Sequence, residues 1–216
     1  MTDWDEQARR AEARYRDGEE RVADEPDARQ RQLTRLGNAA WAAGLSALMA
    51  GRVDDARAWL ERASDRYRES YRDAPPDSWG RPVAILKALL VAGLPAADAA
   101  RWTLGEGAAA ASSPIGRYAA TLAHAVLGEW EDVRVLADEL RTHDGFPHDV
   151  ADALAFLAAE DVVGYVVAVE SVLASFERRD EFLEDVRVAD TVLALQALAA
   201  NRGIAAELDS PLLPAG

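Results

Sequence analysis

Cysteine is absent from the 216-residue sequence. The chain therefore cannot form disulfides, cysteine-ligated zinc sites or a thiol nucleophile, and this suits a reducing compartment. Long apolar runs are missing as well, since the longest, Val83 to Val91, is interrupted by Lys87 and is too short to cross a bilayer. The amino terminus is acidic and lacks the basic-then-apolar order of a signal peptide. We therefore expect a soluble cytoplasmic protein without a membrane partner.

Lysine is nearly absent too, because Lys87 is the only one and arginine supplies the rest of the positive charge. The formal net charge is −14. A surface this negative repels phosphate backbones, so we expect no nucleic-acid partner. An acidic, lysine-poor and alanine-rich composition is typical of a salt-rich cytosol, where screening reduces self-repulsion, and we favour a halophilic source. A GC-rich genome, which also favours alanine and arginine, is the alternative.

Glycine and proline are few, at 14 and 9 residues, and half of the chain is hydrophobic. This composition is typical of a globular protein and not of a disordered one. The length allows one domain, which we place at residues 1–216. The Pro75-Pro76 pair makes residues 74–78 the candidate internal boundary.

Apolar residues recur at helical spacing along the whole chain, which predicts an all-α protein. The third predicted helix, for example, places Val53, Ala56 and Leu60 on one stripe. Ser113-Pro114 indicates a helix start and Arg202-Gly203 a helix end. We expect about ten helices, at residues 4–22, 26–50, 53–74, 79–92, 95–104, 113–127, 130–142, 147–159, 161–178 and 185–202.

The stretch from Ala40 to Ala63 resembles a tetratricopeptide repeat. Small residues lie where the two helices of such a pair cross closely, at Ala40, Gly44 and Ala47 on the first helix and Ala56 and Ala63 on the second. Related turns recur at Gly128 and Glu160, spaced close to the repeat period of about 34 residues. The expected fold is therefore a right-handed tetratricopeptide-like array of antiparallel helix pairs, or an irregular helical bundle.

Two histidine–aspartate pairs, His143-Asp144 and His148-Asp149, flank a Gly-Phe-Pro turn, and His124 lies upstream. This order resembles that of the HD-type metal-dependent phosphohydrolases. The resemblance implies that His124, His148 and Asp149 hold a divalent metal beside a phosphoester. The alternative, which we favour, is a helix start at Pro147 with Asp149 at its positive end. We accordingly expect no bound metal, no cofactor and no catalytic residue.

Two further segments allow a chemical interpretation. Gly105-Glu106-Gly107 could form a phosphate-binding loop, but it lacks the Lys-Ser/Thr ending, and we favour a flexible helix connection. Lys87 could be a nucleophile in a pocket, or it could extend from a helix edge to water, which we favour.

Six tryptophans are many for this length. Those with a polar flank could be exposed anchors of a binding face, because tryptophan is favoured at interface hot spots. The alternative, which we favour, is that they fill wedges between helices. The candidate partner-binding residues are Trp59, the first choice for a surface anchor, with Trp41, Trp130 and Arg52.

The carboxyl-terminal region, from about Val169, resembles the end of the immunity protein 49 family, whose members are associated with bacterial polymorphic toxins. The resemblance is carried by three segments: Val192 to Ala199, Asn201 to Ile204, and Glu207 to Pro214. It implies a non-enzymatic protein that binds and masks a toxin. The acidic surface suits a basic partner. A metal-dependent phosphohydrolase and a structural subunit of a larger assembly are the alternatives, and homo-oligomerisation is compatible with each.

Overall fold

The structure is a computed structural model that describes residues 2–215. This part of the chain contains ten α-helices, two short 3₁₀ helices and no strand. The α-helices are α1 (Trp4–Glu19), α2 (Pro26–Met49), α3 (Val53–Tyr71), α4 (Gly80–Val91), α5 (Ala97–Gly105), α6 (Pro114–Leu127), α7 (Trp130–Leu140), α8 (His148–Ala158), α9 (Val162–Glu177) and α10 (Asp190–Asn201). The 3₁₀ helices are η1 (Ala108–Ala110) and η2 (Leu183–Asp185). The predicted all-α array of about ten helices is confirmed. None of the helices described combines the length and the apolar character needed to cross a membrane.

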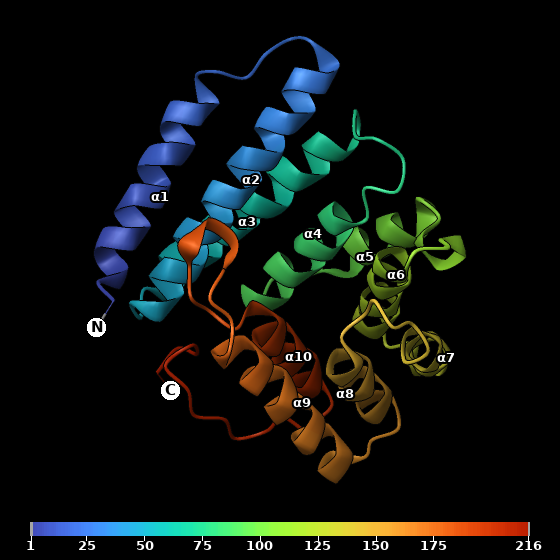
Figure 1. Ribbon diagram of the computed structural model, residues 1–216. Helices are drawn as coiled ribbons and strands as arrows, with labels where there is room; N and C mark the ends of the chain where they lie inside the picture. The colour runs from blue at the N-terminus through green and yellow to red at the C-terminus, as the bar shows by residue number, and fades with distance from the viewer. Residues whose placement is uncertain (1, 216) are drawn as a thin grey trace.

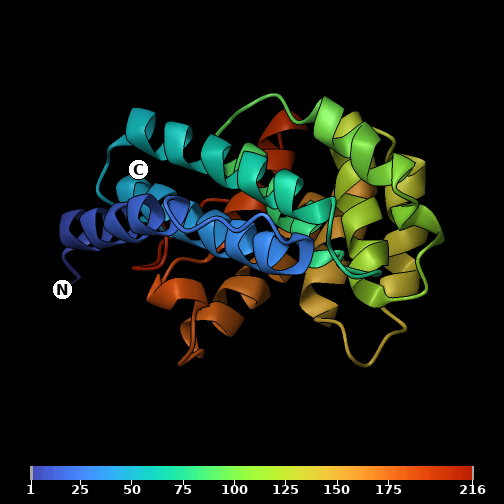
Figure 2. The ribbon, with the colours of Figure 1, turned by 90° about the horizontal axis from the view of Figure 1, so that it is seen from above.

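Helices that follow one another in the sequence lie side by side (Figure 1). The chain packs α1 on α2, α2 on α3 and α3 on α4, and then continues through α5 to α9. The last helix departs from this order, because α10 returns to pack against both α4 and α9. Seen from above, α1 to α3 extend to one side and α6 to α8 stack at the other (Figure 2). The array is therefore closed by its final helix.

Helices α2 and α3 cross closely, as the small residues predict. Ala40, Ala47 and Ala63 are fully buried. A Cβ atom built on Gly44 would lie 2.7 Å from Leu60 Cγ and 3.1 Å from the Leu60 backbone nitrogen. Only a residue without a side chain lets the two backbones approach this closely.

Local signals place most helix ends. The Ser113 side chain caps α6 by accepting a hydrogen bond from the Gly116 amide at 3.2 Å, and Pro114 occupies the first turn. Asp161 caps α9 in the same way through the Gly164 amide at 2.9 Å. The valine-rich segment is thus helical as expected. Position 164 requires glycine, because an added Cβ atom would lie 2.5 Å from the Phe156 ring on α8.

Three helix boundaries differ from the prediction by three residues or more. Helix α3 ends at Tyr71 instead of near Ala74. Helix α1 ends at Glu19 instead of near Val22. The Gly18 carbonyl accepts hydrogen bonds from the Arg21 amide at 3.1 Å and from the Gln32 side chain at 2.9 Å. Helix α10 begins at Asp190 and not at residue 185, because Asp185 has a φ of 59° and the chain after it is extended. There the Ala189 amide pairs with the Leu212 carbonyl at 3.0 Å.

One continuous cluster of buried apolar residues runs from Ala11 on α1 to Leu212 near the end of the chain. A smaller cluster surrounds Trp79, Ala108 and Leu136. The 74–78 segment is the loop between α3 and α4, and these two helices pack directly against each other across it. The core is therefore shared between the two sides of the proline pair.

Candidate functional site

Helix α3 borders two neighbouring pockets. The first, the α1–α3 pocket, has a volume of about 440 Å³. It is lined by Tyr15, Arg16, Glu19, Trp59, Arg62, Asp65 and Arg66. The second, the α3–α5 pocket, has a volume of about 750 Å³. Its main side chains are Asp65, Arg68, Glu69, Tyr71, Arg72 and Trp102. Asp65 belongs to both, so the pockets adjoin, and we call them together the α3 surface.

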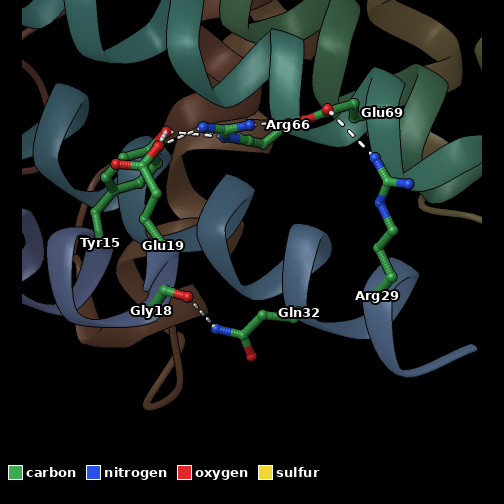
Figure 3. Close-up of polar contacts among 7 residues, drawn as sticks. All are labelled: Tyr15, Gly18, Glu19, Arg29, Gln32, Arg66 and Glu69. Atoms are coloured by element: carbon green, nitrogen blue, oxygen red, sulfur yellow. Dashed lines mark hydrogen bonds and ion pairs between the residues drawn. The ribbon is translucent and has the colours of Figure 1, made fainter. Parts of the chain in front are cut away.

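Arg66 fixes the wall of the α1–α3 pocket (Figure 3). Its Nε donates to the Tyr15 hydroxyl at 2.9 Å, and its other nitrogens pair with Glu19 on α1 and, at 2.7 Å, with Glu69 on α3. Arg29 on α2 reaches the second oxygen of Glu69 at 3.9 Å. Arg66 therefore ties α1, α2 and α3 together at the pocket rim.

These contacts also affect protonation. Burial disfavours the Arg66 cation, but the hydrogen bonds to Tyr15 and Glu69 outweigh it and raise the pKa of the guanidinium. Burial raises the pKa of the Tyr15 hydroxyl, and Arg66 offsets part of that rise. Arg66 thus stays charged and Tyr15 stays neutral, so the charges of these two side chains do not change across physiological pH.

Two aromatic rings form the base of the α1–α3 pocket. Tyr15 and Trp59 meet edge to face with their ring centroids 5.2 Å apart. The Arg62 guanidinium carbon lies 4.7 Å from the Trp59 ring centroid. Arg62 pairs with no carboxylate among residues 2–215, so its N–H edges stay available while its face is held by the indole.

The α3–α5 pocket repeats this arrangement. The Arg68 guanidinium carbon lies 4.7 Å from the Trp102 ring centroid. Tyr71 packs edge to face on the same ring at 5.1 Å. The α3 surface thus carries two arginine–tryptophan stacks, one on each side of Asp65.

The three tryptophans among the candidate partner-binding residues are buried or partly buried, as the favoured wedge interpretation expects. Trp59 is only 8% exposed, because Tyr15 and Arg62 cover it, so it is a pocket base and not a protruding anchor. Trp41 is 3% exposed and fills the core, as the wedge interpretation holds. Trp130 packs on the core beneath Arg202, whose guanidinium carbon is 4.1 Å from its ring. Arg52 forms ion pairs with Asp5 and Asp55.

The favoured interpretation, a helix start at Pro147, agrees with the structure, since α8 begins at His148 with Asp149 in its first turn. The alternative, a metal site of His124, His148 and Asp149, is not formed. His124 lies in the last turn of α6, beside the start of α7, whereas His148 begins α8 after α7 has ended. The 11 residues of α7 separate them by about 16 Å of helix. His148 is exposed, and the Asp149 side chain accepts a hydrogen bond from the Val150 amide at the helix start.

His124 instead meets acidic residues of the α6–α7 turn. Its Nδ1 lies 2.6 Å from Glu129 Oε2 and 3.9 Å from Asp132 Oδ2. Of the residues described, these three form the group whose ligand atoms, all within 4.8 Å of one another, could hold a metal ion. The short His124–Glu129 contact is accounted for by a hydrogen bond across the turn that Gly128 makes, so the cluster is explained without an ion.

The other two chemical candidates also have structural roles. Lys87 lies inside the fold, where its Nζ contacts Asp190 at 2.7 Å and the Thr191 hydroxyl at 3.0 Å, and it does not extend from a helix edge to water. Gly105 ends α5, and Gly107 has a φ of 92° before the short helix η1. This is the expected helix connection.

Asp65, which both pockets share, gives a test of the electrostatics. Asp65 lies at the surface, but partial desolvation, together with Glu61 and Glu69, raises the pKa of its carboxyl above the usual 3.8. The folded protein therefore disfavours the ionised form, at a cost that is full above the folded pKa and absent below the unfolded one. Asp65→Asn should raise the melting temperature at pH 7, and the gain should disappear as the pH falls through 3.8. The control is Asp144→Asn, an exposed position where the substitution changes the net charge equally. An equal rise in melting temperature for this variant would show that net charge, and not the surroundings of Asp65, causes the effect.

The carboxyl-terminal residues that carry the family resemblance hold the tail in place. Gln196 on α10 accepts from the Ala206 amide at 3.1 Å and from the Tyr165 hydroxyl at 2.9 Å. Ser210 donates to Glu177 at 2.8 Å, and Leu212 is buried. No protein-family model matches this chain, and no curated protein or solved structure matches it either.

Proposed function

We propose that this chain is a non-enzymatic protein-interaction module and that it binds its partner over the α3 surface. The observation that carries the proposal is the pair of arginine–tryptophan stacks, Arg62 on Trp59 and Arg68 on Trp102, in the walls of two adjoining pockets. Tryptophan, tyrosine and arginine are the residues that contribute most to protein interfaces. Stacking restrains the guanidinium before binding, so less side-chain entropy is lost in the complex.

The proposal extends to the kind of partner. The resemblance of the carboxyl-terminal region to the immunity protein 49 family supports an immunity-type role, in which the module masks a toxin. The net charge of −14 supports a toxin that is basic overall, because opposite charges steer the encounter. A tetratricopeptide-like stacking of the helix pairs agrees with such a role, since helical arrays present extended binding surfaces.

The test is affinity capture from a lysate of the source cells, quantified by mass spectrometry. The wild-type chain is compared with an Arg62→Gln/Arg68→Gln variant and with an Arg134→Gln/Arg178→Gln control. Both pairs are exposed and lose the same charge, but only the first lies on the α3 surface. We expect a protein that the wild type and the control capture equally and that the α3 variant captures at least about tenfold less, a loss of roughly 1.4 kcal/mol.

A captured set that is the same for all three forms would contradict the proposal. For the immunity role, the captured protein should inhibit growth when it is expressed alone and should not do so when the wild-type chain is coexpressed. Continued inhibition of growth in the presence of the wild-type chain would contradict the immunity role but not the proposed protein interaction.

A further inference from the structure

The α1–α3 pocket differs in charge from the rest of the chain. The sequence has 24 basic and 38 acidic side chains, yet this pocket is lined by three arginines and two carboxylates. One of those carboxylates, Glu19, is already paired with Arg66. The lining of this pocket therefore carries one more positive than negative side chain, on a protein that is acidic overall.

The three arginines are not equivalent. Arg66 is engaged by Tyr15, Glu19 and Glu69, so its donors are used within the fold. Arg16 has one contact, to Glu12 at 3.1 Å, on a largely exposed side chain. Arg62 lies flat against Trp59 and pairs with no carboxylate in the described part of the chain. Arg62, with Arg16 beside it, is thus the group able to take a further anion.

Such an anion would have to be compact and singly charged. Glu19 and Asp65 line the same pocket, and the surrounding protein carries a large negative charge, so each extra negative charge is penalised. A planar carboxylate matches the two parallel N–H groups of a guanidinium, while the methylene groups of its side chain can pack on Tyr15 and Trp59. A phosphate backbone brings a row of charges that the acidic surface repels.

We infer that the α1–α3 pocket binds an acidic side chain of the partner protein, with Arg62 as the carboxylate-binding residue and Trp59 as the residue that positions it. The inference rests on the proposed function, since it names the anchor by which the partner is held at the α3 surface. A partner that is basic overall meets this requirement with one exposed glutamate or aspartate.

The inference is tested with a small probe that has few charges. The full-length ¹⁵N-labelled chain is titrated with acetyl-Gly-Leu-Glu-Leu-Gly-amide, which carries a single carboxylate, and, separately, with versions carrying glutamine or lysine in place of the glutamate. The indole N–H signal of Trp59, assigned from its loss in Trp59→Phe, reports occupancy of the pocket. We expect the glutamate peptide to shift this signal in a saturable way, with the other two binding at least about tenfold more weakly.

Substitutions of Arg62 then test whether it is the residue that binds the carboxylate. Arg62→Gln should weaken binding of the glutamate peptide about tenfold, and Arg62→Lys should recover only part of the affinity because an ammonium lacks the paired donors. Arg134→Gln, an exposed arginine on α7, should change the affinity less than about twofold. Because Arg62 is exposed, these variants should fold, and unchanged melting temperatures check this.

Three results would overturn the inference: equal binding of the glutamine peptide, an affinity indifferent to Arg62→Gln, or a six-nucleotide single-stranded RNA that saturates the pocket more tightly than the glutamate peptide. Concentration-dependent dimerisation that Arg62→Gln abolishes would also overturn it, since a second copy would then occupy the pocket. If the peptide fails while Arg62→Gln/Arg68→Gln still abolishes capture of the partner, the inference falls and the proposed function stands.

Discussion

Replacing Gly44 with valine should destabilise the protein by about 3 kcal/mol, which lowers the melting temperature by roughly 10 °C for a chain of this size. The first atom that either alanine or valine adds would lie 2.7 Å from Leu60 Cγ and 3.1 Å from a backbone nitrogen of α3. Neither is the free end of a flexible side chain, so α2 and α3 must move apart. Gly44→Ala should cost about 1–2 kcal/mol despite the roughly 1 kcal/mol that alanine gains in a helix.

The matched control is Gly105→Ala. Gly105 is also helical, and an added Cβ atom there meets no atom within 4 Å. This substitution should stabilise the fold by a few tenths to about 1 kcal/mol. Urea unfolding followed by circular dichroism measures all three variants. Stabilisation by alanine at both glycines would show that helix propensity, and not the α2–α3 contact, decides the outcome.

The positions of the helices and the close crossing of α2 and α3 could be predicted because the responsible signals are local. Apolar periodicity, the Ser113 cap and the small residues around Gly44 all lie within a few turns of the structure they determine. The start of α10 was predicted too early for a related reason. The left-handed backbone at Asp185 and the pairing of Ala189 with Leu212 depend on a segment that returns from the end of the chain.

The candidate site could be predicted only in part. Trp59 was the first choice for a surface anchor, but its ring is covered, because Tyr15, which packs on it, comes from a different helix. The stack of Arg62 on Trp59 has a local signal, a spacing of three residues on one helix face, that would have identified it. The stack of Arg68 on Trp102 joins α3 to α5 and has none. The alternative metal site, which the sequence analysis did not favour, is not formed for the opposite reason, since motifs that are neighbours in the sequence lie at opposite ends of α7.

The α3 surface also bears on the predicted high-salt environment. Salt at such concentrations screens the long-range attraction between an acidic chain and a basic partner. Contacts made by a stacked guanidinium and an aromatic ring act at short range and in a partly dehydrated pocket, so they are screened much less. If the source is halophilic, the pockets and not the net charge should supply most of the affinity.

The second large effect concerns the closure of the array by α10. Lys87 on α4 and Asp190 on α10 form an ion pair at 2.7 Å, with side chains only 12% and 21% exposed. Removing one member of such a pair leaves a poorly solvated charge. Asp190→Ala should cost about 3 kcal/mol, because the ammonium keeps only the Thr191 hydroxyl and the face of Trp41, 5.8 Å away. Lys87→Met should cost less, about 2 kcal/mol, because the first turn of α10 still favours a carboxylate.

The double variant separates a paired interaction from two independent ones. Lys87→Met/Asp190→Ala removes both charges, so its cost should be below the sum of the single costs by about 1–2 kcal/mol, as urea unfolding would measure. The same cycle on Arg101 and Asp98, an ion pair with side chains 64% and 96% exposed, should give a coupling below about 0.5 kcal/mol. Additive costs at Lys87 and Asp190 would show that packing of α10 on α4, and not the ion pair, holds the last helix in place. A coupling well above that of the exposed pair would identify the only lysine of the chain as the residue that holds the array closed.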